Sequence, residues 1–336
     1  MLASPTGTLP DSLAGWAIEP KWDGIRVVAE CTAQRVRLWT RNGNDKAPQF
    51  PEIASALSAL AAEDGPMVLD GEIVALDARG SALRFQALQG RVHAERDVTA
   101  SRNGSARAAL VAFDLLADDG RPLTGLAWSE RRKALEARIP ARRGAVVRRG
   151  ESVRCGTTAA RKLFERARAE HWEGVLLKRV DASYSAGRRT PDWRKVKLER
   201  EQEFVIGGYT APTEGAARDH FGALLVGYYD GEGLRYAGKV GTGYTQTMLR
   251  FLARKLAPLR RRSAPFLDAP RTGLASTTWV EPVLVAQVRY NEMTEAGILR
   301  QPSFLGLRDD KDARDVRLES TGSASGAVTN GLRCAS

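Results

Sequence analysis

The feature that most constrains the fold is a change in the sequence pattern near residue 199. Before this point, candidate strands alternate with amphipathic helices. After it, short β-type runs are separated by turns that carry glycine and aspartate. At the usual ~100–200 residues per domain, a chain of 336 residues is long enough for two domains. We therefore expect a first domain over residues 1–200 and a second over residues 201–318. The Ser- and Gly-rich composition of residues 319–336 predicts a disordered tail.

The first domain is predicted to mix strands and helices. Its clearest element is a helix over residues 157–172, where apolar residues recur at helical spacing and Thr157 or Thr158 stands ready to cap the N-terminus. Two further helices are expected, over residues 51–62 and 129–139. The β-type pattern indicates strands over residues 27–30, 35–39, 67–76, 110–116, 174–179 and 194–198.

The second domain is predicted to be dominated by strands. The β-type runs cover residues 204–209, 223–229, 234–240 and 279–290, and one amphipathic helix covers residues 245–256. Short strands around a single helix are typical of a small β-barrel such as an OB-fold, which is a common platform for nucleic acid. The expected fold class is therefore α+β, with a mixed domain followed by an OB-fold barrel.

Composition narrows the classes of function. The net charge of +11 favours nucleic acid as a partner, because Lys and Arg release counterions from phosphates; the alternative is an Arg-rich composition set by genomic base bias. The three cysteines are scattered and never form a CxxC pair, which argues against a disulfide framework or a structural zinc site. With no apolar run of roughly 18–20 residues and no secretory signal pattern, a cytoplasmic location is expected.

The segment Lys21-Trp22-Asp23-Gly24-Ile25-Arg26 carries the strongest chemical signal. A lysine is a poor nucleophile while protonated, but on a tight Gly-containing loop beside cations or a metal it can attack phosphorus. A four-position KxDG pattern also occurs by chance, and the alternative for Lys21 is an ordinary solvated hairpin lysine.

Further motifs follow Lys21 in a fixed order, namely RNG at residues 41–43, LDGEI at 69–73, EGVLLK at 173–178, WRKVK at 193–197 and RQPSFLGLRDDK at 300–311. With these motifs the sequence resembles the covalent nucleotidyltransferase superfamily of ATP-dependent DNA ligases and mRNA capping enzymes. It looks closest to the bacterial ATP-dependent ligases, including the ligase module of bacterial end-joining proteins. The resemblance covers about residues 14–318 and implies an adenylation (nucleotidyltransferase) domain followed by the OB-fold.

The resemblance implies a catalytic set. Lys21 matches the lysine that becomes covalently adenylylated, and Arg26 would touch the AMP ribose or the 5′-phosphate of a nick. Lys195 and Lys197 match the lysines that face the phosphates, and period two along a strand places both on one side. We also expect these two cations to lower the pKa of Lys21.

The resemblance also implies contacts to the nucleotide. Glu19 sits where ligases contact the adenine amino group, and Arg41 matches the arginine that contacts the ribose and triphosphate. Phe113 fits the aromatic residue that stacks on adenine, although an ordinary core phenylalanine is a serious alternative. Leu176 would cover the opposite face of the base.

Carboxylates on apolar strands indicate a metal site. Glu72 and Glu173 stand among residues that should be buried, where a carboxylate is rare unless it is paired or bound to metal. The family match implies that they hold Mg²⁺ or Mn²⁺, hard cations suited to carboxylates and triphosphate. In the second domain, Arg308 and Lys311 match the residues that bind the leaving pyrophosphate; nearby, Gln301 stands where family members often have histidine.

The resemblance implies an ATP-dependent DNA ligase that seals a 5′-phosphate to a 3′-hydroxyl in nicked double-stranded DNA, in DNA repair, through lysine-AMP. The expected protein is monomeric and bound to no membrane. One alternative is an RNA ligase or a GTP-dependent capping-type enzyme of the same superfamily. Another is a non-catalytic nucleic-acid-binding protein on the same scaffold, which the intact Lys21, Glu72, Glu173 and Lys197 disfavour.

Overall fold

The computed structural model describes residues 1–6, 13–92, 107–141, 145–170, 172–198, 200–212, 220–269 and 276–319. It divides into two compact units, Met1–Glu199 and Arg200–Glu319. The tail predicted over residues 319–336 lies outside the described residues, apart from Glu319. Among the helices of the described ranges, none is both long and apolar enough to cross a membrane.

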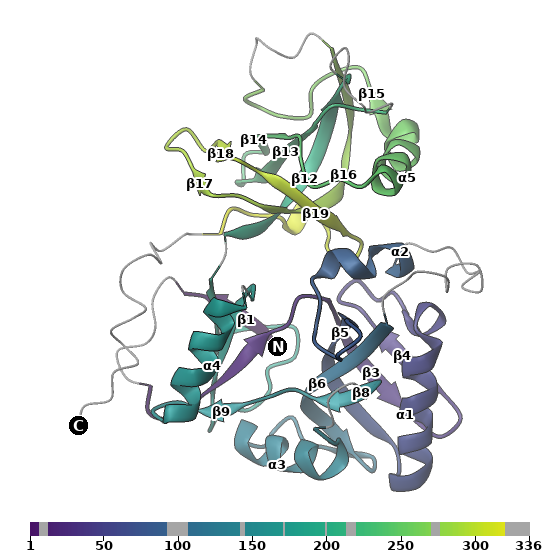
Figure 1. Ribbon diagram of the computed structural model, residues 1–336, viewed down its shortest axis with the longest axis vertical. Helices are drawn as coiled ribbons and strands as arrows, with labels where there is room; N and C mark the ends of the chain where they lie inside the picture. The colour runs from purple at the N-terminus through teal and green to yellow at the C-terminus, as the bar shows by residue number, and fades with distance from the viewer. Residues whose placement is uncertain are drawn as a thin grey trace. The chain divides into compact units, whose positions relative to one another are not determined.

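Two β-sheets form the framework of the first unit (Figure 1). One has the strand order β4 (Val36–Trp39), β3 (Ile25–Cys31), β5 (Met67–Leu76), β6 (Arg107–Asp118) and β7 (Arg121–Pro122), with β8 (Val147–Arg149) parallel to β6. We call it the β5 sheet. The other, the β10 sheet, has the order β1 (Leu2–Pro5), β11 (Arg189–Lys197), β10 (Gly174–Arg179), β2 (Trp16–Lys21) and β9 (Val153–Arg154). The strands predicted from the β-type pattern are all present.

Helices cover one face of each sheet. Ile53 and Leu57 of α1 (Pro51–Asp64) and Leu135 of α3 (Trp128–Arg138) share a buried core with the outer face of the β5 sheet. Helix α4 (Thr158–Ala169) packs in the same way on the β10 sheet. Its predicted cap is confirmed, because Thr157 Oγ1 accepts a hydrogen bond from the Ala160 amide at 3.1 Å. Shorter helices are α2 (Gln89–Val92), η1 (Ala47–Gln49) and η2 (Phe85–Leu88).

The opposite faces of the two sheets meet each other. Phe113 and Leu116 of β6 pack with Trp193 of β11 and with Tyr184 in one buried cluster. Because side chains alternate along a strand, the neighbours of the residues in the helix-covered cores point to this inner side. They enclose the space in which the charged residues of the first unit collect.

The second unit is a small barrel. Strands β12 (Glu201–Thr210), β13 (Leu224–Tyr229), β14 (Leu234–Val240) and β16 (Thr277–Arg289) form an antiparallel sheet, and β19 (Ser303–Arg308) pairs with β16. A parallel bridge between Thr242 and Ser303 joins the end of β14 to β19, which closes the ring in the order β12-β13-β14-β19-β16. Gly243 permits this closure, since its φ is +92° and a Cβ would lie 2.2 Å from the carbonyl oxygen of Phe304.

One helix and several short elements complete the barrel. Helix α5 (Gln246–Leu256) follows β14 in the chain and buries Leu252 and Leu256 in the barrel core, as its amphipathic pattern predicted. Leu249 is the third buried residue, whereas Met248, which the same pattern places on this face, is half-buried. The short elements are η3 (Ala257–Leu259), β15 (Arg260–Arg261), β17 (Glu292–Met293), β18 (Leu299–Arg300) and η4 (Ala313–Asp315).

Candidate active site

Three neighbouring strands bring the predicted catalytic lysines into line. In the register of the β10 sheet, Lys21 of β2 stands opposite Gly174 of β10, and Gly174 stands opposite Lys197 of β11. The next inward row along the same strands consists of Glu19, Leu176 and Lys195. Residues far apart in the sequence therefore form two adjacent rows on one face of one sheet.

The alternation of the sequence decides which face carries these rows. Ile18, Val175, Leu177 and Val196 are buried against α4. Their neighbours along each strand must then point to the opposite, inner face, because the side-chain period of a strand is two. The glycine at position 174 leaves room between Lys21 and Lys197, and a Cβ there would lie 2.2 Å from the carbonyl oxygen of Val196.

Lys21 forms an ion pair with Glu173. Burial by itself lowers the pKa of Lys21, but the charge and hydrogen bond of Glu173, assisted by Asp23 and Glu72, more than reverse this and raise it above its ordinary value. The pKa of Lys21 is thus raised, whereas from the sequence we expected Lys195 and Lys197 to lower it. The nearest strong charge on Lys21 is a carboxylate, so the lysine rests as an ammonium group.

Glu173 is the negative centre of the site. Burial alone raises the pKa of its carboxyl, but Lys21, Lys197 and Lys195 together hold it below its ordinary value. The carboxylate is thus ionised and shared among three cations. Lys195 and Lys197 thus help to keep Glu173 ionised beside Lys21.

The loop after Lys21 brings the second predicted metal carboxylate close to it. A Cβ on Gly24 would lie 2.1 Å from the carbonyl oxygen of Ile73 and 3.0 Å from Cγ of Glu72, so only glycine fits there. The negative charge of Glu72 helps to raise the pKa of Lys21. Glu72 of β5 and Glu173, which directly precedes β10, therefore both act on the charge of Lys21.

Hard cations are commonly held by one or two carboxylates, with phosphates and water completing the coordination. Within the described residues, no cluster of three or more Asp, Glu, His or Cys side chains could bind a metal by itself. The donor set of Glu72 and Glu173 fits a divalent cation that arrives together with a triphosphate.

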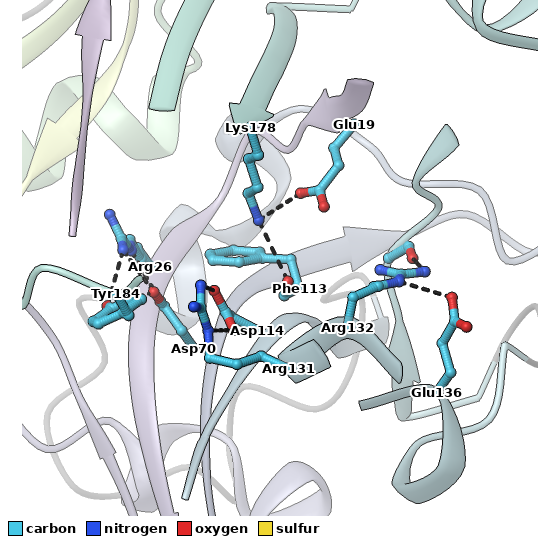
Figure 2. A network of polar contacts seen from close by, with 11 residues as sticks. Glu19, Arg26, Asp70, Phe113, Asp114, Arg131, Arg132, Glu136, Lys178 and Tyr184 are labelled. Atoms are coloured by element: carbon cyan, nitrogen blue, oxygen red, sulfur yellow. Dashed lines mark hydrogen bonds and ion pairs between the residues drawn. The ribbon is translucent and has the colours of Figure 1, made fainter. Parts of the chain in front are cut away.

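Arg26 lies in a network that the sequence did not reveal. Its guanidinium donates two hydrogen bonds to Asp70, at 3.0 and 2.6 Å, and the Tyr184 hydroxyl donates to the same carboxylate at 2.7 Å (Figure 2). Burial raises the pKa of the Asp70 carboxyl, but Arg26 and Tyr184 outweigh it and hold that pKa below its ordinary range. The alternation of side chains along β5 could have indicated that Asp70 belongs to the site, since it stands two residues before Glu72 on the same face.

A second buried ion pair joins Glu19 and Lys178. Their charged atoms lie 2.7 Å apart, with Lys178 fully buried and Glu19 2% exposed (Figure 2). Lys178 was missed in the sequence, although it stands two residues after Leu176 and so lies on the same inner face. The rings of Phe113 and Trp193 flank its ammonium group, with centroids at 4.6 and 4.2 Å.

Phe113 is 6% exposed and sits in the cluster between the sheets. The guanidinium of Arg26 lies 5.7 Å from its ring centroid, in addition to the Lys178 ammonium. Both cations lie close to the ring of Phe113. Its contact with adenine stays a prediction, as does the cover that Leu176, which is half-buried, would give the base.

A cavity of about 550 Å³ opens beside Lys21. Its wall includes Trp22, Arg148, Trp172 and Glu173. The lining of this cavity includes none of Glu19, Leu176 and Phe113. It is large enough to admit charged groups to Lys21.

The remaining predicted residues are Arg41 in the first unit and Arg308 and Lys311 in the second. Arg41 is exposed at the turn after β4. In the second unit, Arg308 donates two 2.8 Å hydrogen bonds to Asp310, and Lys311 lies 3.3 Å from Glu203. Contacts of Arg41, Arg308 and Lys311 with a nucleotide stay predictions.

The chain is similar to known proteins over most of its length. The family described as "ATP dependent DNA ligase domain" matches residues 1–197, and "ATP dependent DNA ligase C terminal region" matches residues 217–311. The multifunctional non-homologous end joining protein LigD of Mycobacterium bovis is 39% identical over 302 residues, which is 90% of this chain and 37% of that protein. LigD of Pseudomonas aeruginosa is 40% identical over 311 residues, 90% of this chain and 34% of that protein.

The chain thus spans little more than a third of these relatives. A solved mycobacterial DNA ligase D, complexed with ATP and MES, is 37% identical with a TM-score of 0.65 and covers 95% of this chain and 98% of its own. The expected α+β adenylation domain followed by an OB-fold is confirmed. With its first 197 residues matched by the catalytic domain and its barrel by the C-terminal region, the chain belongs to the family of ATP-dependent DNA ligases.

Proposed function

We propose that this chain seals nicks in double-stranded DNA, in DNA repair, by joining a 5′-phosphate to a 3′-hydroxyl through AMP carried on Lys21. The observation that carries the proposal is the inward row of Lys21, Gly174 and Lys197, with Glu173 paired to the lysine. Such a row offers one nucleophile, one orienting carboxylate and cations for phosphate within a single sheet face. We also propose that residues 1–200 act as the adenylation domain and residues 201–318 as the barrel domain.

The residues fit ATP as the co-substrate. Glu19 presents a buried carboxylate oxygen with no hydrogen-bond partner among the residues that the structure describes, which suits a donor such as the adenine amino group. Lys195 and Lys197 supply positive charge close to Lys21, which suits the phosphates. The solved relative named above was determined with ATP bound.

Lys21, which is 21% exposed, must lose its proton to solvent water before Nζ attacks the α-phosphorus and displaces pyrophosphate, because an ammonium group has no lone pair. Glu173, whose pKa is lowered, orients Lys21 rather than keeping its proton. Glu72 and Glu173 would hold Mg²⁺ or Mn²⁺, and this cation would supply positive charge that stabilises the phosphates and weakens the hold of Glu173 on Lys21. The nick's 5′-phosphate then takes AMP from Lys21, and the 3′-hydroxyl displaces the AMP.

The family match favours a DNA ligase over an RNA ligase or a GTP-dependent capping enzyme, since both matched regions carry DNA ligase descriptions. A duplex with one labelled nick tests the proposal directly. With ATP and Mg²⁺ the wild-type chain should convert the nicked DNA strand to full length, and Lys21→Ala should not. Sealing of a nicked RNA strand alone, or with GTP in place of ATP, would refute it.

A further inference from the structure

The ion pair between Lys178 and Glu19 lies deeper than the contact between Lys21 and Glu173. Lys178 Nζ is 2.7 Å from Glu19 Oε2 and 3.3 Å from the carbonyl oxygen of Phe113. The ring centroids of Trp193 and Phe113 lie 4.2 and 4.6 Å from the same ammonium group. Three different kinds of contact therefore fix one lysine between the sheets, and a buried ion pair is tolerated only with geometry of this quality.

Glu19 is satisfied on one side only. Oε2 faces Lys178, whereas Oε1 is buried and has no hydrogen-bond partner within the described part of the chain. Figure 2 shows one carboxylate oxygen directed at the ammonium group and the other turned away from it. Because an unpartnered buried carboxylate oxygen costs free energy, it indicates a donor that arrives from outside the chain.

The position of Glu19 relates this acceptor to the reactive lysine. Glu19 and Lys21 stand two residues apart on β2, so both side chains leave the same face, roughly 7 Å apart along the strand. Gly174 and Leu176 of β10 face them in register. A nucleotide whose α-phosphorus lies at Lys21 can extend along this face, so that its base reaches the row of Glu19.

Resting on the proposed function, we propose that Lys178 is a positioning residue that sets the base specificity of this site. It turns the carboxylate of Glu19 so that Oε1 accepts a hydrogen bond from the 6-amino group of adenine. Guanine carries a carbonyl oxygen at the same place, and two facing acceptors repel each other. Selection of ATP therefore depends on a lysine that does not itself touch the reacting atoms.

A pair of nucleotides that differ only at this group tests the inference. Purine riboside 5′-triphosphate carries hydrogen where ATP carries the 6-amino group. The second-order rate constant for forming nucleotide-Lys21 is measured with each, by intact mass against time. We expect the wild-type chain to prefer ATP by roughly 10- to 100-fold, the value of one hydrogen bond to a charged group.

Substitutions of Lys178 distinguish a role in positioning Glu19 from a role in folding. Lys178→Met should reduce the preference to within about threefold, mainly by slowing the reaction with ATP. Lys178→Arg should restore part of it. In the double variant Glu19→Gln/Lys178→Met, the preference for ATP should equal that of Glu19→Gln alone, because Lys178 acts through Glu19. The control Lys162→Met removes the same charge from the exposed face of α4 and should keep the wild-type ratio.

The ratio compares two nucleotides on the same protein sample, so a reduced folded fraction cancels out. If Lys178→Met slows both nucleotides equally and keeps the wild-type ratio, Lys178 is only structural and the inference is wrong. If the wild-type chain forms no covalent nucleotide at all, the proposed function fails first and the inference falls with it.

Discussion

The ion pair between Lys21 and Glu173 makes a quantitative prediction for Glu173→Gln. In the wild-type chain the lysine side chain is 21% exposed and the glutamate 7% exposed, so little solvent screens the pair. The charge of Glu173 is the largest influence that raises the pKa of Lys21. Removing it leaves burial, which lowers this pKa, against the weaker influence of Asp23 and Glu72.

An opposite charge at this range shifts a pKa by roughly 1–3 pH units. Glu173→Gln should therefore lower the pKa of Lys21 by about that amount. Below the pKa, each pH unit changes the neutral fraction of an amine tenfold, so the reactive fraction of Lys21 at pH 8 should rise roughly 10- to 1,000-fold. The pKa of Lys21 should fall, so the variant makes Lys21 more reactive toward a simple electrophile.

Competitive labelling with trace acetic anhydride measures this effect. The ATP-free protein is labelled in EDTA at several pH values, and the Lys21 peptide is quantified by mass spectrometry. Its labelling curve should move to lower pH in Glu173→Gln and stay in place in Glu165→Gln, which removes the same charge from the exposed face of α4.

The rate of adenylylation by ATP should fall in Glu173→Gln, because the orienting carboxylate is lost. Faster acetylation together with slower adenylylation would separate the electrostatic effect from a change in access to Lys21. A labelling curve that is unchanged, or that moves to higher pH, would refute the assignment of Glu173 as the cause of the raised pKa.

Three further predictions concern the framework of the site. Gly174→Ala should lower both the melting temperature and the adenylylation rate, because the added Cβ would lie 2.2 Å from the carbonyl oxygen of Val196; an unchanged melting temperature would contradict this strand packing. Arg131→Met should cost about 3–5 kcal/mol in urea unfolding by leaving the buried Asp114 unpaired, and adding Asp114→Leu should recover most of the loss. The lowered pKa of Asp70 contributes stability that is present above its ordinary pKa of 3.8 and is lost as pH falls through the folded value. Asp70→Asn should therefore flatten the acid limb of the stability curve, and an unaltered limb would count against it.

The sequence predicted local elements well, because periodicity is a local property. The α4 helix ends before the predicted residue 172, but its cap at Thr157 and its buried face follow directly from the spacing of apolar residues. The closure of the barrel through Thr242 and Ser303 was not predictable, since it joins residues distant in the chain through an isolated bridge.

In the candidate site, too, some residues could be predicted from the sequence and others could not. Lys21, Glu173 and Lys197 were predicted from motifs; the register of the strands places Lys21 and Lys197 in one row, and Glu173 pairs with Lys21. The partners that fix the charges were missed, because an ion pair between distant residues leaves no periodic signal. Arg131 lies on a helix of mostly charged residues, yet it is fully buried against Asp114, with hydrogen bonds of 2.8 and 2.9 Å.

The central claim is that Lys21 carries AMP, and intact mass after exposure to ATP and Mg²⁺ tests it most directly. The wild-type chain should gain the mass of one AMP, peptide mapping should place it on Lys21, and addition of pyrophosphate should remove it. Lys21→Ala should gain nothing while keeping the wild-type melting temperature within a few degrees, since the lysine is partly exposed. An adduct that persists in Lys21→Ala, or a wild-type chain that stays unmodified, would contradict the account.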